Sequence, residues 1–135
     1  MKWRFESADA AGAYAARNGL LSYLQSRAEA DSDLEGAAIV FGELIANVAR
    51  HAPGPIAIDV SWEGGLAVLS VSDRGPGFQL RRDTELPEVT AESGRGLFIC
   101  NAIARSLEVT PLPGGGCTVT ACLPVRLQAR FRSAS

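Results

Sequence analysis

The sequence lacks long uncharged apolar runs, and it has no signal-peptide pattern at its start. Because a transmembrane helix needs about 20 consecutive apolar residues, we expect a cytoplasmic protein with no membrane partner. The charge balance is nearly even: Lys and Arg number 13, Asp and Glu number 15, and the net charge is −2. This balance gives no reason to expect direct binding of nucleic acid.

Cysteine is also sparse. Cys100, Cys117 and Cys122 form no CxxC pair, and three cysteines cannot all pair internally. They therefore fit reduced, packed thiols better than a disulfide framework or a zinc site. The length of 135 residues predicts one domain with a core that needs no metal or disulfide. We place this domain in residues 1–125 and a short basic tail in residues 126–135.

Alternating apolar residues and helical spacing predict the element order β-α-α-β-β-loop-α-β-β. This order predicts an α/β (α+β) two-layer sandwich, in which helices cover one face of a mixed, largely antiparallel sheet. Gly64-Gly65 suits a tight hairpin turn, whereas Gly12 and Gly19 interrupt helix-forming sequence. The predicted strands cover residues 1–7, 56–62, 66–72 and a hairpin within 107–125, and the predicted helices cover residues 9–29, 32–52 and 96–107.

The second predicted helix has the clearest start signal. The segment SDLE at residues 32–35 has the shape of a capping box. In this motif the Ser32 hydroxyl accepts a hydrogen bond from the backbone near Glu35, and Glu35 reaches back. Pro53 and Pro55 end the helix. Its apolar stripe is Leu34, Ala37, Ala38, Phe41, Leu44, Ile45 and Val48.

Polar residues lie outside this stripe. Glu43, Asn47 and His51 follow one another at steps of four, with Arg50 beside them, so they share one face of the helix. One interpretation is a solvent-facing surface, with His51 placed where a helix C-terminus favours positive charge. The other is a reaction site, in which the Asn47 carboxamide oxygen binds a hard cation such as Mg²⁺. Glu43 would then orient or deprotonate a nucleophile that attacks a phosphate.

The stretch DRGPGF at residues 73–78 follows a strand in which Leu69, Val71 and Asp73 share one side. Asp73 is therefore expected to point towards the apolar layer. A buried carboxylate is costly unless it is hydrogen-bonded, and the amino group of adenine is a suitable donor. Gly75 and Gly77 would let the backbone approach the base closely. The alternative is an ordinary turn.

The stretch SGRGL at residues 93–97 leads into the third predicted helix. Gly94 and Gly96 would let the backbone approach phosphates, which the free N–H groups at the helix start would bind. Arg95 would add positive charge. The long polar connection before this stretch, residues 79–93, is typical of a lid or a binding loop. The spacing matches neither a dinucleotide fingerprint nor a P-loop.

In this order, ELIANVARH, DRGPGF and SGRGL resemble the GHKL ATPase superfamily, which includes gyrase-type, heat-shock chaperone and histidine-kinase ATPase domains. The resemblance runs from about residue 32 to residue 124. It implies that the chain binds ATP with Mg²⁺, with Asn47 as the Mg²⁺ ligand and Glu43 as the general base. Asp73 would recognise adenine, and residues 79–93 would form the ATP lid. The implied nucleotide-binding residues are Asn47, Arg50, His51, Asp73, Gly75, Gly77, Phe78, Gly94, Arg95, Gly96 and Leu97.

Within this superfamily, the chain is most similar to the stand-alone anti-sigma-factor serine/threonine kinases. Residues 1–31 precede the capped helix, and they are too few to include the phosphoacceptor domain of a sensor histidine kinase. The resemblance implies that a STAS-domain anti-anti-sigma protein is the phosphorylated partner and that a sigma factor is the second partner. Homodimers are common in this branch.

Two features favour other branches. Some members of the superfamily carry an arginine just ahead of the second glycine box, where Glu92 and Ser93 stand here. This departure favours a nucleotide-sensing module without kinase activity. The ending GGGCTVTACLP also resembles the closing hairpin of histidine-kinase catalytic domains, so a stand-alone domain that phosphorylates a histidine is the third hypothesis.

Overall fold

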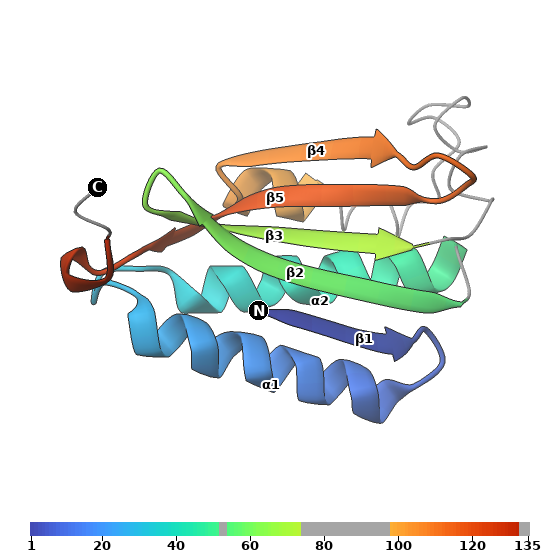
Figure 1. Ribbon diagram of the computed structural model, residues 1–135, viewed down its shortest axis with the longest axis horizontal. Helices are drawn as coiled ribbons and strands as arrows, with labels where there is room; N and C mark the ends of the chain where they lie inside the picture. The colour runs from blue at the N-terminus through green and yellow to red at the C-terminus, as the bar shows by residue number, and fades with distance from the viewer. Residues whose placement is uncertain (52–53, 74–97, 133–135) are drawn as a thin grey trace.

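The computed structural model describes residues 1–51, 54–73 and 98–132. Five strands form one sheet in the order β1-β2-β3-β5-β4, and each neighbouring pair is antiparallel (Figure 1). The helices cover one face of this sheet, so the predicted two-layer α+β sandwich is confirmed. The strands are β1 (Lys2–Glu6), β2 (Pro55–Glu63), β3 (Leu66–Asp73), β4 (Ser106–Pro111) and β5 (Cys117–Arg126); the helices are α1 (Ala10–Arg27), α2 (Leu34–His51), a helical segment at residues 98–103 and the 3-10 helix η2 (Ala129–Phe131).

The sheet turns its apolar side towards the helices. Along β5, buried residues alternate with half-buried ones, as expected of a strand with one covered face. On the other face, hydroxyl groups pair between strands, and Ser72 Oγ lies 2.8 Å from Thr118 Oγ1. Because successive side chains alternate, Leu69, Val71 and Asp73 of β3 all face the helical layer.

The core lies between the sheet and the two long helices. α2 packs on β5 and β3 and also contacts α1. Among the described residues, no helix combines the length and the apolar character that crossing a membrane requires. The core side chains of the helices are Ala16, Leu20 and Leu24 of α1 and Ala37, Val40, Phe41, Leu44 and Val48 of α2.

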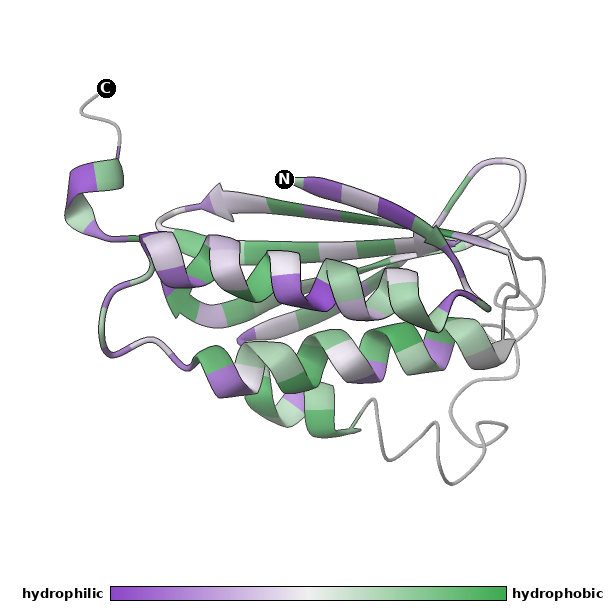
Figure 2. Cartoon of the chain, turned by 90° about the horizontal axis from the view of Figure 1, so that it is seen from below, coloured by the Kyte–Doolittle hydropathy of each residue, from purple (hydrophilic) through white to green (hydrophobic). Residues whose placement is uncertain are grey.

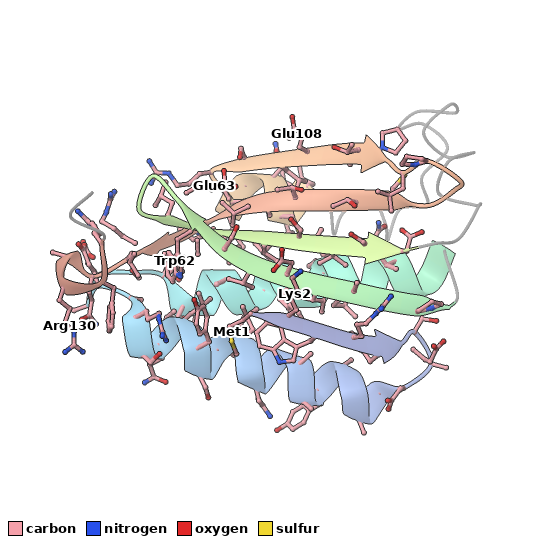
Figure 3. All side chains as sticks on the ribbon, in the orientation of Figure 1. Met1, Lys2, Trp62, Glu63, Glu108 and Arg130 are labelled. Carbon is pink, nitrogen blue, oxygen red and sulfur yellow. The ribbon has the colours of Figure 1, made fainter. Side chains whose placement is uncertain are left out.

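α1 is one continuous helix although it contains Gly12 and Gly19. A Cβ atom at Gly12 would lie 2.9 Å from the Cβ atom of Phe5, and one at Gly19 would lie 3.2 Å from ring carbons of Trp3. The glycines therefore let β1 pack closely on α1, which offsets their low helix propensity. Trp62 Nε1 donates a hydrogen bond to the hydroxyl of Tyr23 over 2.9 Å, which joins the end of β2 to the same helix (Figure 3).

α2 begins one residue later than the capping-box pattern predicted. Asp33, not Ser32, caps the helix, because its Oδ1 accepts a hydrogen bond from Gly36 N–H over 2.8 Å. The Ser32 hydroxyl instead accepts one from the backbone N–H of Arg126 over 2.9 Å, although 94 positions separate the two residues. The prediction was wrong because this distant partner competes for the hydroxyl, and Asp is as good an N-cap as Ser.

The hairpin turn between β2 and β3 has the predicted form. Gly64 and Gly65 have φ angles of 61° and 83°, which lie in the left-handed region that a two-residue hairpin turn of this kind requires. Residues with a Cβ atom adopt that region only at a cost. The two glycines therefore determine the register in which β2 and β3 pair.

Residues 127–132, within the predicted basic tail, lie against the connection between α1 and α2. Arg132 Nη2 lies 3.0 Å from Glu29 Oε2, and Gln128 Nε2 donates a hydrogen bond to the Ala28 carbonyl oxygen over 2.9 Å. We call this region, where the α1–α2 connection, the end of β5 and residues 127–132 meet, the stapled end.

Candidate functional site

The last turn of α2 and the end of β3 lie at the other end of the sandwich (Figure 1). Residues 52–54 join α2 to β2, and Ile56 at the start of β2 pairs with Asp73 at the end of β3. The helical segment 98–103 runs beside α2, where Cys100 Sγ lies 3.7 Å from the Val40 carbonyl oxygen. We call this region, which holds Glu43, Asn47 and Asp73, the polar end.

Asn47 is buried near the end of α2, with 3% of its surface exposed, so the solvent-facing interpretation does not hold for it. Its Oδ1 atom has no hydrogen-bond partner among the described residues. A buried polar atom without a partner costs about 1–3 kcal/mol, so this position favours a ligand that supplies one. An amide oxygen is a hard donor of the kind that Mg²⁺ takes, and Asn47 therefore fits the predicted cation.

Asp73 is 1% exposed and faces the helical layer, as the alternation along its strand predicted. Within the part of the chain that the structure describes, Asn47 and Asp73 are the two buried polar residues, and both lie at the polar end. A carboxylate is retained in such a place only where hydrogen-bond donors reach it. The amino group of adenine is such a donor, so Asp73 fits the predicted base recognition.

Glu43 lies one turn before Asn47 and is half-buried. It follows Val40 by three residues and Gly36 by seven, so it shares the side of α2 on which those two residues meet segment 98–103. A general base needs access to an incoming nucleophile and a position close to the reacting phosphate. Its partial exposure gives Glu43 that access, and its place one turn from Asn47 would put it close to a phosphate whose Mg²⁺ Asn47 held.

Cys100 is the residue at this end that the sequence pattern did not single out. Burial and, to a smaller extent, the Glu43 carboxylate raise the pKa of its thiol to about 12. The thiol is therefore protonated at physiological pH and is a poor nucleophile. The cysteine pattern predicted that Cys100 is a packed thiol, but no sequence signal indicated that it would lie against α2, the helix of Glu43 and Asn47.

None of the three cysteines forms a disulfide, and all three lie within the described residues. Cys100 and Cys117 are buried, and Cys122 is half-buried. The predicted packing is therefore confirmed for Cys100 and Cys117 and holds in part for Cys122.

The two glycine motifs fall outside the described residues, so their predicted roles stay predictions. Arg50 and His51 belong to the last turn of α2, but their side chains are not described either. The positions outside the described ranges are Gly75, Gly77, Phe78, Gly94, Arg95, Gly96, Leu97 and the predicted lid at residues 79–93.

The chain matches a known family. The model of the histidine kinase-, DNA gyrase B-, and HSP90-like ATPases matches residues 32–127. This span includes α2, both glycine motifs and strands β2 to β5, and it confirms the resemblance to the GHKL superfamily. No curated protein matches the chain.

Proposed function

Because the chain belongs to the family of histidine kinase-, DNA gyrase B-, and HSP90-like ATPases, we propose that it is a protein-serine kinase. It transfers the γ-phosphate of ATP to a serine of a STAS-type anti-anti-sigma protein and controls a sigma factor by partner switching. The family match itself shows a GHKL-type ATPase domain; the serine acceptor, the STAS partner and the sigma factor belong to the proposal. One observation supports the nucleotide site above all: Asn47 and Asp73, suited to Mg²⁺ and adenine, are buried at the same end.

Three side chains have separate roles in the proposed reaction. Asp73 accepts a hydrogen bond from the amino group of adenine and so selects the base. Asn47 would hold Mg²⁺ through Oδ1, and Mg²⁺ at that position would supply positive charge for the phosphate oxygens. Glu43 takes the proton of the serine hydroxyl as the new O–P bond forms and the bond from the γ-phosphorus to ADP breaks.

A phosphotransfer assay tests the proposal. The purified chain is incubated with Mg²⁺, γ-labelled ATP and, one at a time, each STAS-domain protein encoded in the same genome. We expect acid-stable phosphate on one serine of one of these proteins, and none when Mg²⁺ is chelated. Bound ATP with no transfer to any STAS protein would contradict the serine kinase.

The same assay separates two other candidate functions. Glu92 and Ser93, where some members of the superfamily carry an arginine, favour a nucleotide-sensing module that binds ATP and transfers nothing. The GGGCTVTACLP ending favours a histidine-kinase type of catalytic domain. That function would leave acid-labile, base-stable phosphate on a partner histidine.

The proposal includes two further partners. A sigma factor is held inactive by the chain, and a second copy of the chain forms the homodimer common in the branch that it resembles. Light scattering of the chain, alone and mixed with sigma factors of the same genome, measures both complexes. A monomer that binds no sigma factor would limit the proposal to phosphotransfer.

A further inference from the structure

α2 carries apolar residues on its outward face as well as on its buried one. Ile39, Gly42 and Ala46 follow at steps of three and four residues, so they share one face, and all three are exposed, with Ile39 at 46%. We call these three residues the outer stripe. A surface helix ordinarily turns polar residues to solvent. Figure 2 looks onto the helical layer and shows α2 strongly hydrophobic along much of its length, while α1 carries more hydrophilic residues.

The outer stripe borders Glu43. On an α-helix, residues four apart differ by about 40° around the axis, so Glu43 lies close to the line of Ile39. Glu43 also follows Val40 by three residues and Gly36 by seven, and both of these meet segment 98–103. Cys100 Sγ lies 3.7 Å from the Val40 carbonyl oxygen, and a Cβ atom on Gly36 would lie 2.9 Å from Ile103 Cγ2. Phe98, at the start of that segment, is 73% exposed. Exposed apolar side chains therefore lie on both helices, with Ile39 one turn before the proposed base and Phe98 two residues before Cys100.

We propose that the outer stripe and Phe98 form the docking surface for the STAS-type phosphoacceptor protein; this inference rests on the proposed function. The acceptor oxygen must come within about 3 Å of the base that deprotonates it. A folded acceptor is much wider than that distance, so its surface around the serine must cover the residues that border Glu43. On the solvent side of α2, these residues are the outer stripe.

The chemistry of the surface defines the matching face of the acceptor. Gly42 and Ala46 have little or no side chain, so an apolar side chain of the acceptor can approach the backbone of α2 closely. Glu35, exposed one turn before Ile39, adds negative charge at one end of the stripe. The acceptor therefore presents an apolar face around its serine, with Lys or Arg at the edge that meets Glu35.

A second copy of the chain is the competing occupant. If two α2 helices packed through their outer stripes, they would cover the residues that border Glu43. A protein acceptor could then not reach Glu43. Docking of the acceptor and pairing of two copies through this face therefore exclude each other. The homodimer of the proposed function has to use another surface.

Gly42→Lys tests the inference without threatening the fold. Among the described residues beyond its own helical neighbours, no atom lies within 4 Å of a Cβ atom placed on Gly42. Lys also has a higher helix propensity than Gly, so the midpoint of thermal unfolding should stay the same or rise. We expect the KM for the phosphoacceptor to rise at least about tenfold. ATP affinity and ATP hydrolysis without acceptor should not change. Ala15→Lys, which adds the same charge on the exposed face of α1, is the matched control and should keep the parent KM.

A photo-cross-linking residue in place of Ile39 identifies the occupant directly. A cross-link to the phosphorylated STAS protein supports the inference, whereas a cross-link between two copies of the chain overturns it. If Gly42→Lys and Ile39→Asp both keep the parent KM, the docking surface is wrong while the kinase stands. If the parent chain binds ATP but phosphorylates no STAS protein, the proposed function fails, and the occupant assigned here fails with it.

Discussion

At the stapled end of the sandwich, polar groups of the chain bond to one another. The Ser32 hydroxyl accepts a hydrogen bond from Arg126, and Arg132 lies 3.0 Å from Glu29. At the polar end, Asn47 and Asp73 are buried, and Asn47 Oδ1 has no partner among the described residues. Local rules of polar satisfaction are broken mainly at functional sites, so the two ends should respond differently to substitution. Changes at the polar end should alter binding and catalysis, and changes at the stapled end should alter stability.

The largest effect is expected for Glu43→Ala. Without a carboxylate to take the serine proton, transfer to the acceptor should slow by about 10²–10⁴-fold, while ATP affinity stays close to that of the parent. Single-turnover transfer from labelled ATP measures the rate. Glu63→Ala, which removes an exposed acid at the end of β2, is the control. Transfer by Glu43→Ala at the parent rate would exclude a general-base role.

Asp73→Asn should have the next largest effect. The substitution keeps the shape of the side chain but replaces a charged acceptor with an amide. Loss of a charge-assisted hydrogen bond to adenine should weaken ATP binding roughly 10- to 100-fold, a larger change than in stability. Calorimetric titration with ATP and with GTP measures the affinity and the choice of base. Parent-like ATP affinity in this variant would mean that DRGPGF is an ordinary turn.

Asn47→Ala sharpens the comparison at the same end. The variant removes an oxygen that has no partner among the described residues, so the loss of that oxygen itself costs the fold no described hydrogen bond. In the presence of Mg²⁺ the affinity for ATP should fall about tenfold, and in the presence of a chelator it should not change. Val48→Ala shortens a neighbouring buried side chain. It should lower the free energy of unfolding and leave the Mg²⁺ dependence of ATP binding unchanged. Equal Mg²⁺ dependence in Asn47→Ala and the parent would contradict the assigned ligand.

Local patterns predicted much of this molecule. The element order, the Gly64-Gly65 turn and the inward direction of Asp73 follow from side-chain period and backbone conformation, which neighbouring residues determine. The N-cap of α2 was predicted one residue early, because the partner of Ser32 is Arg126, from the other end of the chain. The burial of Asn47 could not be predicted from the sequence and was found only in the structure. Its depth depends on how the sheet and segment 98–103 pack around α2, which no local pattern encodes.

The smallest effect is expected at the stapled end. Asp33→Ala removes the N-cap of α2 and should lower the free energy of unfolding by about 1 kcal/mol. Ser32→Ala removes the acceptor for the Arg126 N–H and should cost a similar amount. Chemical denaturation measures both losses, and ATP affinity should stay unchanged in each variant. If either substitution weakened ATP binding as strongly as Asp73→Asn, the two ends would not be independent.

The central claim is that the polar end is a Mg-ATP site. Calorimetric titration of the unmodified chain with ATP in the presence of Mg²⁺ tests it most directly. We predict saturable binding heat and a higher midpoint of thermal unfolding, because a ligand that binds only the folded state stabilises that state. The absence of both binding heat and thermal shift at millimolar Mg-ATP would contradict the claim.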